Sequence, residues 1–194
     1  RKAASGFIHG FRYNVRSLSY LLNERYHNAD LPHDHIDITL DALVTHVTDR
    51  LTIVSSLFQC FGVLCDVLFV PAAGGKAVLY KDLPRKHIVQ SRPDILRREG
   101  HIFIITLQFG FPRYDGSRSA NDFIQDSGTL DTRCGAFLHP VFEVYRDGEH
   151  LDEFHLFETL DLRFNTAHKK TQSLSTLNQR LLKDNFNYFL QLQP

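Results

Sequence analysis

Hydrophobic residues recur at helical spacing in the first part of the chain. The positions that share spacings of three and four residues are Phe7, Phe11, Val15, Leu18 and Leu22. Such a stripe predicts an amphipathic helix with one apolar face. Ser5, followed by Gly6, is a suitable N-cap residue. The polar stretch 27–37, which contains Pro32, ends the helix and is predicted to be a linker.

The same period continues over residues 39–61 and predicts a second helix, which Gly62 is well placed to end. Its apolar positions are Leu40, Leu43, Val44, Val47, Leu51, Val54, Leu57, Phe58 and Phe61. A last helix is predicted over 174–190. Leu174, Leu177, Leu181 and Phe186 would form its apolar side.

Between these helices the pattern changes to short apolar runs, which are typical of strands. Residues 63–70 and 77–80 flank a Gly-rich turn and predict a hairpin, and 101–109 read as a buried strand. A second hairpin is predicted around Asp147-Gly148, between 137–146 and 151–157. Residues 84–90 favour a short helix, 160–164 a further strand, and 110–135 a long loop.

These elements predict an α+β fold. One N-terminal helix is followed by a linker, then by a helix, β-hairpins in a mostly antiparallel sheet and a C-terminal helix. Among the 194 residues, Lys+Arg and Asp+Glu both number 22, so no basic surplus favours nucleic acid as a partner. No apolar run approaches the roughly 18 residues of a membrane span. The chain contains no Met and begins Arg1-Lys2, so we expect a processed or partial sequence.

Cysteine and histidine give no strong metal pattern. Cys60, Cys65 and Cys134 are an odd number without a CxxC motif, so buried structural thiols are expected. A Cys60–Cys65 disulfide in an oxidising compartment is the minor alternative, and the sequence leaves the redox state of all three open.

Two groups of histidines are candidate metal ligands. His33-Asp34-His35 could bind a metal, but in a polar stretch with a proline a solvated turn is the commoner case. His150 and His155 stand at odd separation in a predicted strand and are expected on opposite faces. No metal site is therefore predicted.

The start of the first helix carries the most informative chemistry. Gly6 and Gly10 stand four residues apart, and without side chains the helix can approach a flat ligand or another backbone closely. A helix N-terminus also offers free N–H groups and about half a positive charge, which suits an anionic or carbonyl-rich ligand edge. On these residues alone, tight packing is the commoner explanation.

A resemblance adds to this reading. Ser5-Gly6-Phe7-Ile8-His9-Gly10-Phe11-Arg12-Tyr13 resembles the final helix of the FAD-binding domain in two-dinucleotide-fold flavoproteins. More specifically, it is similar to the FAD-dependent oxidoreductase domain-containing flavoproteins of the endoplasmic reticulum (ER), which are linked to ER-associated degradation. The further matching motifs are Arg16, Leu22-x-x-Arg25-Tyr26-His27 and Phe137-Leu138-His139-Pro140-Val141 with Tyr145-Arg146.

The resemblance implies a role for the helix start. In such flavoproteins this helix points its N-terminus at the pyrimidine side of the isoalloxazine ring, where its dipole stabilises negative charge on the reduced flavin. The implied FAD-binding residues are Ser5, Gly6, Phe7, Ile8, His9 and Gly10. No residue of this chain is assigned a catalytic role.

The resemblance also implies a domain division and a function. Residues 1–27 would be the last helix of a truncated FAD-binding domain, 28–38 a linker and 39–194 a C-terminal α+β domain. The whole protein would transfer hydride from NAD(P)H, with NADP expected, to FAD, and then pass electrons to a disulfide or another acceptor in the ER lumen. The family's glycine-rich fingerprints are absent from this chain. We therefore expect that it neither catalyses this reaction nor retains FAD alone.

Two partners follow from this view. The first is the FAD-binding domain of the same protein, whose sheet would be covered by the stripe of residues 1–26. Phe7 and Phe11 should then be less buried in this chain than Leu57 or Ile104. The second is a client or a protein of the ER degradation machinery. In the alternative hypothesis, residues 39–194 are a non-catalytic interaction domain for that partner.

Overall fold

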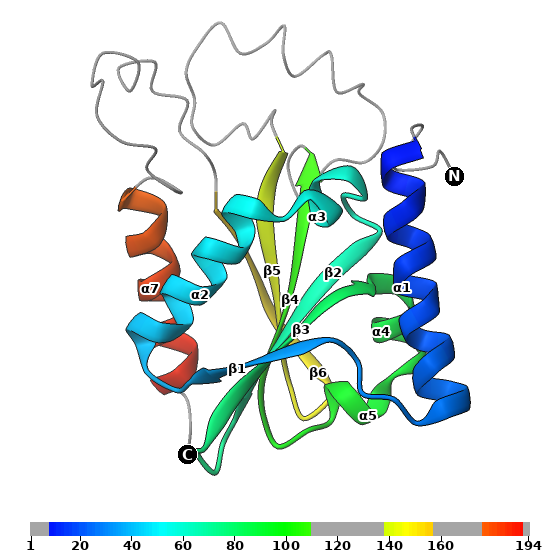
Figure 1. Cartoon of the computed structure of the whole chain (residues 1–194). Helices are drawn as coiled ribbons and strands as arrows, with labels where there is room; N and C mark the ends of the chain where they lie inside the picture. The colour runs from blue at the N-terminus through cyan, green and yellow to red at the C-terminus, as the bar shows by residue number, and fades with distance from the viewer. Residues whose placement is uncertain (1–7, 110–137, 157–175, 192–194) are drawn as a thin grey trace, which may run out of the picture.

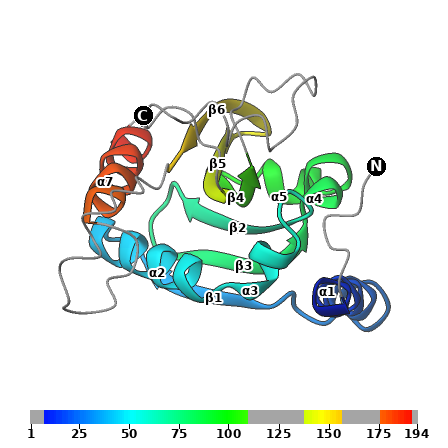
Figure 2. The same cartoon turned by 90° about the horizontal axis from the view of Figure 1, so that it is seen from above.

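The computed structural model describes residues 8–109, 138–156 and 176–191. Within these ranges, six strands form one antiparallel sheet in the order β1-β3-β2-β4-β5-β6. Helix α1 runs along one side of the molecule, while α2 and α7 lie together at the other side (Figures 1 and 2). The α+β class with a C-terminal helix is thereby confirmed.

The elements have the following bounds. The strands are β1 (His33–Asp37), β2 (Leu64–Pro71), β3 (Lys76–Pro84), β4 (Gly100–Phe109), β5 (Leu138–Arg146) and β6 (Glu149–His155). The helices are α1 (Ile8–His27), α2 (Leu40–Ile53), α3 (Ser55–Gln59), α4 (Arg85–Ser91), α5 (Pro93–Leu96) and α7 (Thr176–Gln191). The predicted strand at 160–164 and loop at 110–135 lie outside the described residues.

Two hydrophobic cores hold the sheet between its helices. On one face, α2 and α7 pack against β2, β4 and β5, and the ring centroids of Phe103 and Phe186 are 4.9 Å apart. On the other face, Ile88 of α4 and Ile95 of α5 cover Cys65, Val67, Ile102 and Ile104. The central strands β2 and β4 thus alternate their side chains between two buried layers.

The predicted stripe of the last helix is only partly correct. Phe186 is fully buried, but Leu181 is 39% exposed, and the buried neighbours of Phe186 are Leu182 and Phe189. These three positions follow the i, i+4, i+7 spacing of a helix face. Leu174 and the side chain of Leu177 lie outside the described residues.

Residues 33–37, which lie inside the segment 28–38 predicted as a linker, form the strand β1. This strand pairs with β3 from His33↔Tyr80 to Asp37↔Lys76. Its one buried side chain is that of Ile36, so the pattern of hydrophobic and polar residues over this segment looks polar throughout. Short, charged strands of this kind are typical of sheet edges.

The helix predicted over 39–61 is two helices. Thr39 caps α2 by accepting a hydrogen bond from the Ala42 amide, and Val54 is extended, with φ −77° and ψ 90°. The chain then turns into α3, and Gly62 follows in the left-handed region at φ 67°. No glycine or proline marks the break at Val54, so periodicity alone could not reveal it.

The expectation that His150 and His155 lie on opposite faces is also wrong. A bulge in β6 places His150 opposite Tyr145 and His155 opposite Val141, and these two β5 positions share a face. His155 instead shares a short hydrogen bond with His139, whose Nε2 lies 2.7 Å from the Nδ1 of His155. Among the described residues, no group of three or more His, Cys, Asp or Glu side chains is arranged to hold a metal.

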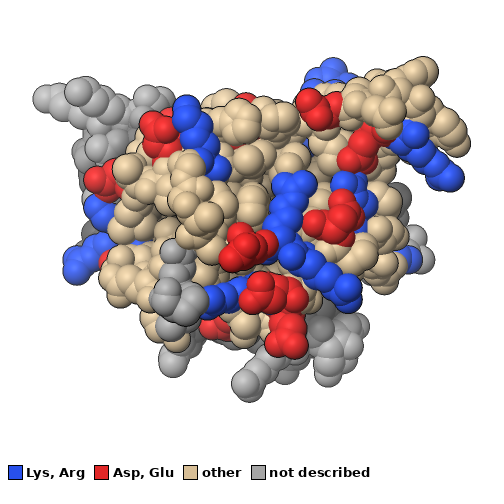
Figure 3. Space-filling model, turned by 90° about the horizontal axis from the view of Figure 1, so that it is seen from below, with Lys and Arg blue, Asp and Glu red and all other residues tan. Residues whose placement is uncertain are grey.

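The charged side chains of both signs lie close together on the surface. On the face shown in Figure 3, basic and acidic side chains are interleaved. In the part of the chain that the structure describes, no helix is long and apolar enough to cross a membrane.

His101 gives a testable pH dependence. It is 1% exposed beside Val70 and Arg146, and neither ring nitrogen has a hydrogen-bond partner among the described residues. Burial lowers the pKa of His101, the charge of Arg146 lowers it further, and Asp147 opposes them. The unfolded chain therefore binds this proton first, near pH 6.5, and stability is lost as the pH falls from there towards the folded-state pKa.

We expect His101→Leu to remove this part of the acid sensitivity. The free energy of unfolding, measured with urea, should decrease between pH 7.5 and pH 5.5 in both proteins. This decrease should be about 1 kcal/mol smaller in the variant than in the parent chain. Equal losses in the two proteins would show that His101 is not the titrating group.

Candidate functional site

Helix α1 presents its apolar face to solvent. The large hydrophobic residues exposed along it are Ile8, Phe11, Val15, Leu18, Leu22 and Tyr26. Phe11 is 67% exposed, whereas Leu57 and Ile104 are fully buried, which confirms the expectation for Phe11; Phe7 lies outside the described residues. A helix of a globular domain normally turns such a face toward its own core.

The opposite face of α1 packs on the rest of the chain. Gly10 and Ser17 are buried, Tyr13 lies against the cluster around Leu57, and Tyr20 and Leu21 lie against the cluster around Ile88. Spacings of three and four join Gly10, Tyr13, Ser17, Tyr20 and Glu24 on this face, and Leu21 lies beside Tyr20. Apart from Leu21, the inner face of the helix is therefore small, aromatic or polar.

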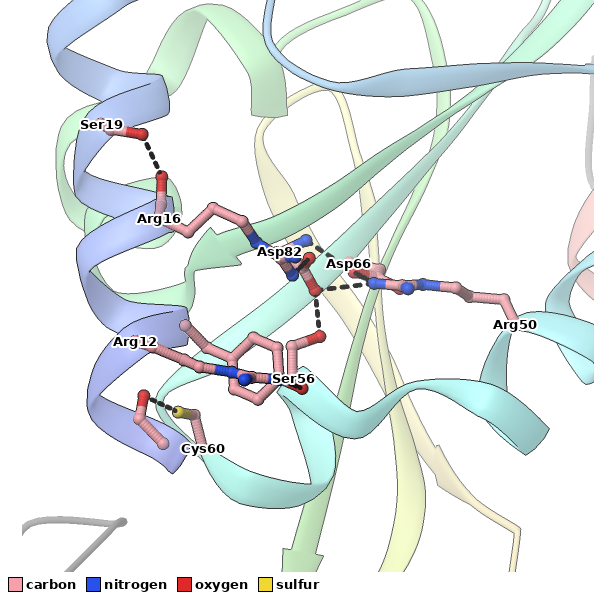
Figure 4. Close-up of polar contacts among 10 residues, drawn as sticks. Arg12, Arg16, Ser19, Arg50, Ser56, Cys60, Asp66 and Asp82 are labelled. Carbon is pink, nitrogen blue, oxygen red and sulfur yellow. Dashed lines mark hydrogen bonds and ion pairs between the residues drawn. The ribbon is translucent and has the colours of Figure 1, made fainter. Parts of the chain in front are cut away.

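A buried charge network lies beneath the middle of α1 (Figure 4). Arg16 donates to Oδ2 of Asp82 at 2.6 Å, and Arg50 of α2 donates to Oδ1 of the same carboxylate at 2.7 Å. The hydroxyl of Ser56, from α3, also donates to this Oδ1. Asp82 thus joins three helices to β3.

Asp66 of β2 completes the network. Arg50 donates to both of its carboxylate oxygens, at 2.7 and 3.1 Å, and the backbone N–H of Asp82 donates to its Oδ1 at 2.8 Å. Asp66 is 1% exposed, and this burial raises its pKa against the opposing effect of Arg50. The fork geometry of arginine is the arrangement that holds a buried carboxylate in its charged form.

The backbone around this network is irregular. Asp82 adopts a left-handed φ of 56°, and the β2–β3 register shifts between Cys65 and Val67. Left-handed backbone costs a non-glycine residue free energy, and it persists where surrounding contacts demand it. Here it turns the Asp82 carboxylate toward Arg16 and Arg50.

A second buried ion pair lies on the other face of the sheet. Arg85 donates to both oxygens of Glu143, at 2.6 and 2.8 Å, and the Tyr145 hydroxyl donates to Oε2 of Glu143 at 3.3 Å. Burial, together with the Glu143 charge, raises the pKa of Tyr145 to about 12. Cys65 is buried nearby, and its thiol pKa is raised by burial and by neighbouring carboxylates.

The structure places only part of the predicted flavin-facing residues. Ser5, Gly6 and Phe7 lie outside the described residues. Ile8 and His9 are exposed, whereas Gly10 is buried and its carbonyl accepts the Cys60 thiol at 3.3 Å. The backbone of Gly10 is therefore in contact with Cys60 of the C-terminal part of the chain.

Both described cysteines match the expectation of buried thiols. Cys60 and Cys65 are free and buried, and Cys134 lies outside the described residues. Burial and the Asp82 charge raise the thiol pKa of Cys60, while a hydrogen bond from Asn14 opposes them. Neither thiol is thus in the thiolate form that reacts readily.

Sequence reasoning missed the charged network entirely. Asp66 and Asp82 stand inside or beside runs predicted as strands, where a carboxylate is unusual unless it is paired. These two carboxylates in predicted strands were the available sign of a buried network. The arginines that pair with them, Arg16 and Arg50, lie far away in the sequence. Only the fold brings these four groups together.

The fold and the site together define an α+β unit that packs against the polar face of a helix and leaves the apolar face of that helix exposed. The chain is 31% identical over 171 residues to mouse "FAD-dependent oxidoreductase domain-containing protein 2", covering 86% of this chain and 24% of the mouse protein. It is 29% identical over 152 residues to the zebrafish protein of the same name, covering 75% of this chain and 20% of that protein.

Homologues of this name thus cover most of the chain and support the family that the sequence resembles. The chain spans no more than about a quarter of the length of these curated relatives. No family model matches the chain. No solved structure matches it either.

Arg50→Gln tests the energetic importance of the network. It leaves the Asp66 and Asp82 carboxylates, among the described residues, with Arg16 as their one remaining arginine partner, so we expect about 3–5 kcal/mol of destabilisation at pH 7.5. Arg50 lowers the pKa of Asp66 against the effect of burial, so without Arg50 this pKa should rise, the folded state should take up a proton, and part of the loss should be recovered at pH 5.5.

Chemical denaturation at the two pH values measures both effects, and the exposed Lys86→Gln serves as a charge-matched control. Equal stability of the two variants at pH 7.5 would contradict the network's importance. A penalty that does not shrink at pH 5.5 would contradict the proposed protonation.

Proposed function

We propose that this chain is the C-terminal part of a FAD-dependent oxidoreductase. The whole protein transfers hydride from NAD(P)H to FAD and passes the electrons to a disulfide or another acceptor. Both relatives are named FAD-dependent oxidoreductases, which supports the general class. The family resemblance of residues 5–13 supports the use of NAD(P)H as the hydride donor and the transfer of electrons to an acceptor.

The orientation of α1 is the structural observation that carries the proposal. Its polar face is bound by this chain, while six large hydrophobic side chains point to solvent. Burying each of these fully would stabilise an interface by about 1.5–3 kcal/mol. Most of the length of the relatives lies outside this chain, and we propose that their FAD-binding part covers this face.

The start of α1 is compatible with a flavin nearby. The described elements from β1 to α7 are called the C-terminal unit below. Ile8 is 86% exposed and His9 is exposed, so this unit leaves that end of the helix uncovered. The first N–H groups of a helix lack intrahelical acceptors and favour a partly negative ligand edge. We therefore propose that Ser5, Gly6, Phe7, Ile8, His9 and Gly10 border FAD, which supplies the hydride-accepting ring when bound.

Cellular setting and partners are further parts of this proposal. We propose NADP(H) as the electron donor, the ER lumen as the compartment, and proteins of ER-associated degradation as partners. The family resemblance alone supports these points.

Exposed hydrophobic residues favour a second candidate function, a protein-binding domain. Ile53 and Phe58 are 76% and 57% exposed at the ends of α2 and α3, and Val63 is 40% exposed just beyond. Exposed hydrophobic side chains are typical of protein contacts when they form a patch. This role is compatible with the first, because these residues lie on the C-terminal unit.

Flavin content tests the oxidoreductase proposal. The whole protein, purified through gel filtration, should be yellow with a flavin absorbance spectrum, and this chain alone should be colourless. In the whole protein, Gly6→Val should lower flavin occupancy with the unfolding midpoint of the C-terminal unit unchanged, because a β-branched side chain would displace the ring. Full occupancy in the variant would remove position 6 from the flavin site.

Whether a partner covers the exposed hydrophobic stripe of α1 is tested by measuring the stability effect of one substitution in this chain and in the whole protein. Leu18→Asn should change the free energy of unfolding of this chain by less than about 0.5 kcal/mol, since Leu18 is 53% exposed. In the whole protein the same change should cost about 2–4 kcal/mol, because it buries a polar amide at an apolar interface. Leu57→Asn, at a buried position, should destabilise both. Equal small effects of Leu18→Asn in both lengths would show that nothing covers the stripe.

A further inference from the structure

We infer that Arg16 is a positioning residue that fixes α1 on the C-terminal unit and thereby sets where the flavin-facing end of the helix lies. The attachment of α1 stands on the geometry of this chain. The consequence for the flavin rests on the proposed function.

The polar contacts that attach the inner face of α1 to the rest of the chain are unequal in strength. Cys60 donates to the Gly10 carbonyl, but a thiol is a weak donor. Glu24 pairs with Arg92 at 2.9 Å, and Arg92 keeps a second partner in Asp94 if Glu24 is lost. The contact of Arg16 with Asp82 differs, because it reaches a carboxylate whose side chain is only 7% exposed.

The charge balance of the buried network depends on Arg16. Asp66 and Asp82 bring two negative charges, and Arg50 with Arg16 brings two positive charges. Asp66, Asp82, Arg50 and Ser56 all belong to the C-terminal unit, so that unit alone would hold one uncompensated carboxylate. An unpaired buried charge is strongly unfavourable, and the arginine of α1 removes it.

Other charged groups close to the network do not replace Arg16. Arg85 is engaged by both oxygens of Glu143 on the opposite face of the sheet. The buried thiol of Cys60 is uncharged near neutral pH because its pKa is raised. Among the described residues, Arg16 is the α1 side chain that pairs with Asp82.

The position of Arg16 along α1 makes it effective. Six residues separate it from Gly10, which corresponds to about 9 Å of helix at 1.5 Å per residue. A helix is stiff over this length, so a rotation or tilt at Arg16 moves the first turn by a comparable amount. The same side chain therefore couples the buried network to the uncovered helix start.

Hydrogen exchange in this chain tests the attachment. In Arg16→Gln, protection factors of the α1 amides should fall by about tenfold or more, because a hydrogen bond to a charged partner is lost, while those of β2 and β4 stay unchanged. Arg25→Gln on the same helix, with its guanidinium over the Tyr26 ring, is the matched control and should change them by less than about twofold. Arg16→Lys should be intermediate, since it keeps the charge without the fork.

Acidification separates charge compensation from simple packing. The loss of α1 protection in Arg16→Gln should be smaller at pH 5.5 than at pH 7.5, because burial raises the pKa of Asp66 and its protonation would remove the uncompensated negative charge. Equal α1 protection in Arg16→Gln and Arg25→Gln, or a defect independent of pH, would overturn the inference.

The whole protein then tests the link to the flavin. With FAD bound, Arg16→Gln should shift the flavin fluorescence and reduction potential relative to the parent protein and to Arg25→Gln. An unchanged flavin signature with a loosened α1 would overturn the positioning role. A parent protein that binds no FAD would instead overturn the proposed function and leave the attachment result standing.

Discussion

The buried carboxylate of Asp82 is the constraint on which the arrangement of this chain depends. A charge removed from water must be paired, and the pairing here needs Arg50 from α2, Ser56 from α3 and Arg16 from α1. Asp82 takes a left-handed backbone conformation at a point where the β2–β3 register is irregular. The break at Val54 between α2 and α3 precedes Ser56 by two residues, which lets a helix turn deliver its hydroxyl.

The same constraint decides which face of α1 turns inward. The hydrophobic effect alone would turn Phe11, Leu18 and Leu22 toward the nearest core, yet these side chains are exposed. Arg16 and Glu24 lie on the face toward the C-terminal unit and pair with Asp82 and Arg92. We infer that electrostatic pairing fixes the rotation of the helix, which leaves its apolar face exposed in this chain.

The sequence predicts the parts of this structure that depend on neighbouring residues, and it does not predict those that depend on residues far apart in the chain. Local periodicity predicted α1, the strand β4 and the hairpin at Asp147-Gly148, where φ is 54° and 85°. It could not predict β1, which has one buried side chain, or the break at Val54, which lacks a breaker residue. Periodicity also shows that α1 has an apolar face without showing what that face covers. The network of Asp66 and Asp82 depends on arginines 16 to 66 residues away, beyond the reach of any local pattern.

These contacts bear on where one domain ends and the next begins. The sequence favours a boundary between residues 27 and 39, after the helix. In the structure, however, β1 already belongs to the sheet, and Arg16 completes the charge balance of a network in the C-terminal unit. A cut after α1 would leave Asp66 and Asp82 with one arginine. The inner face of α1 is therefore part of the packed C-terminal unit, whereas its outer face is exposed in this chain.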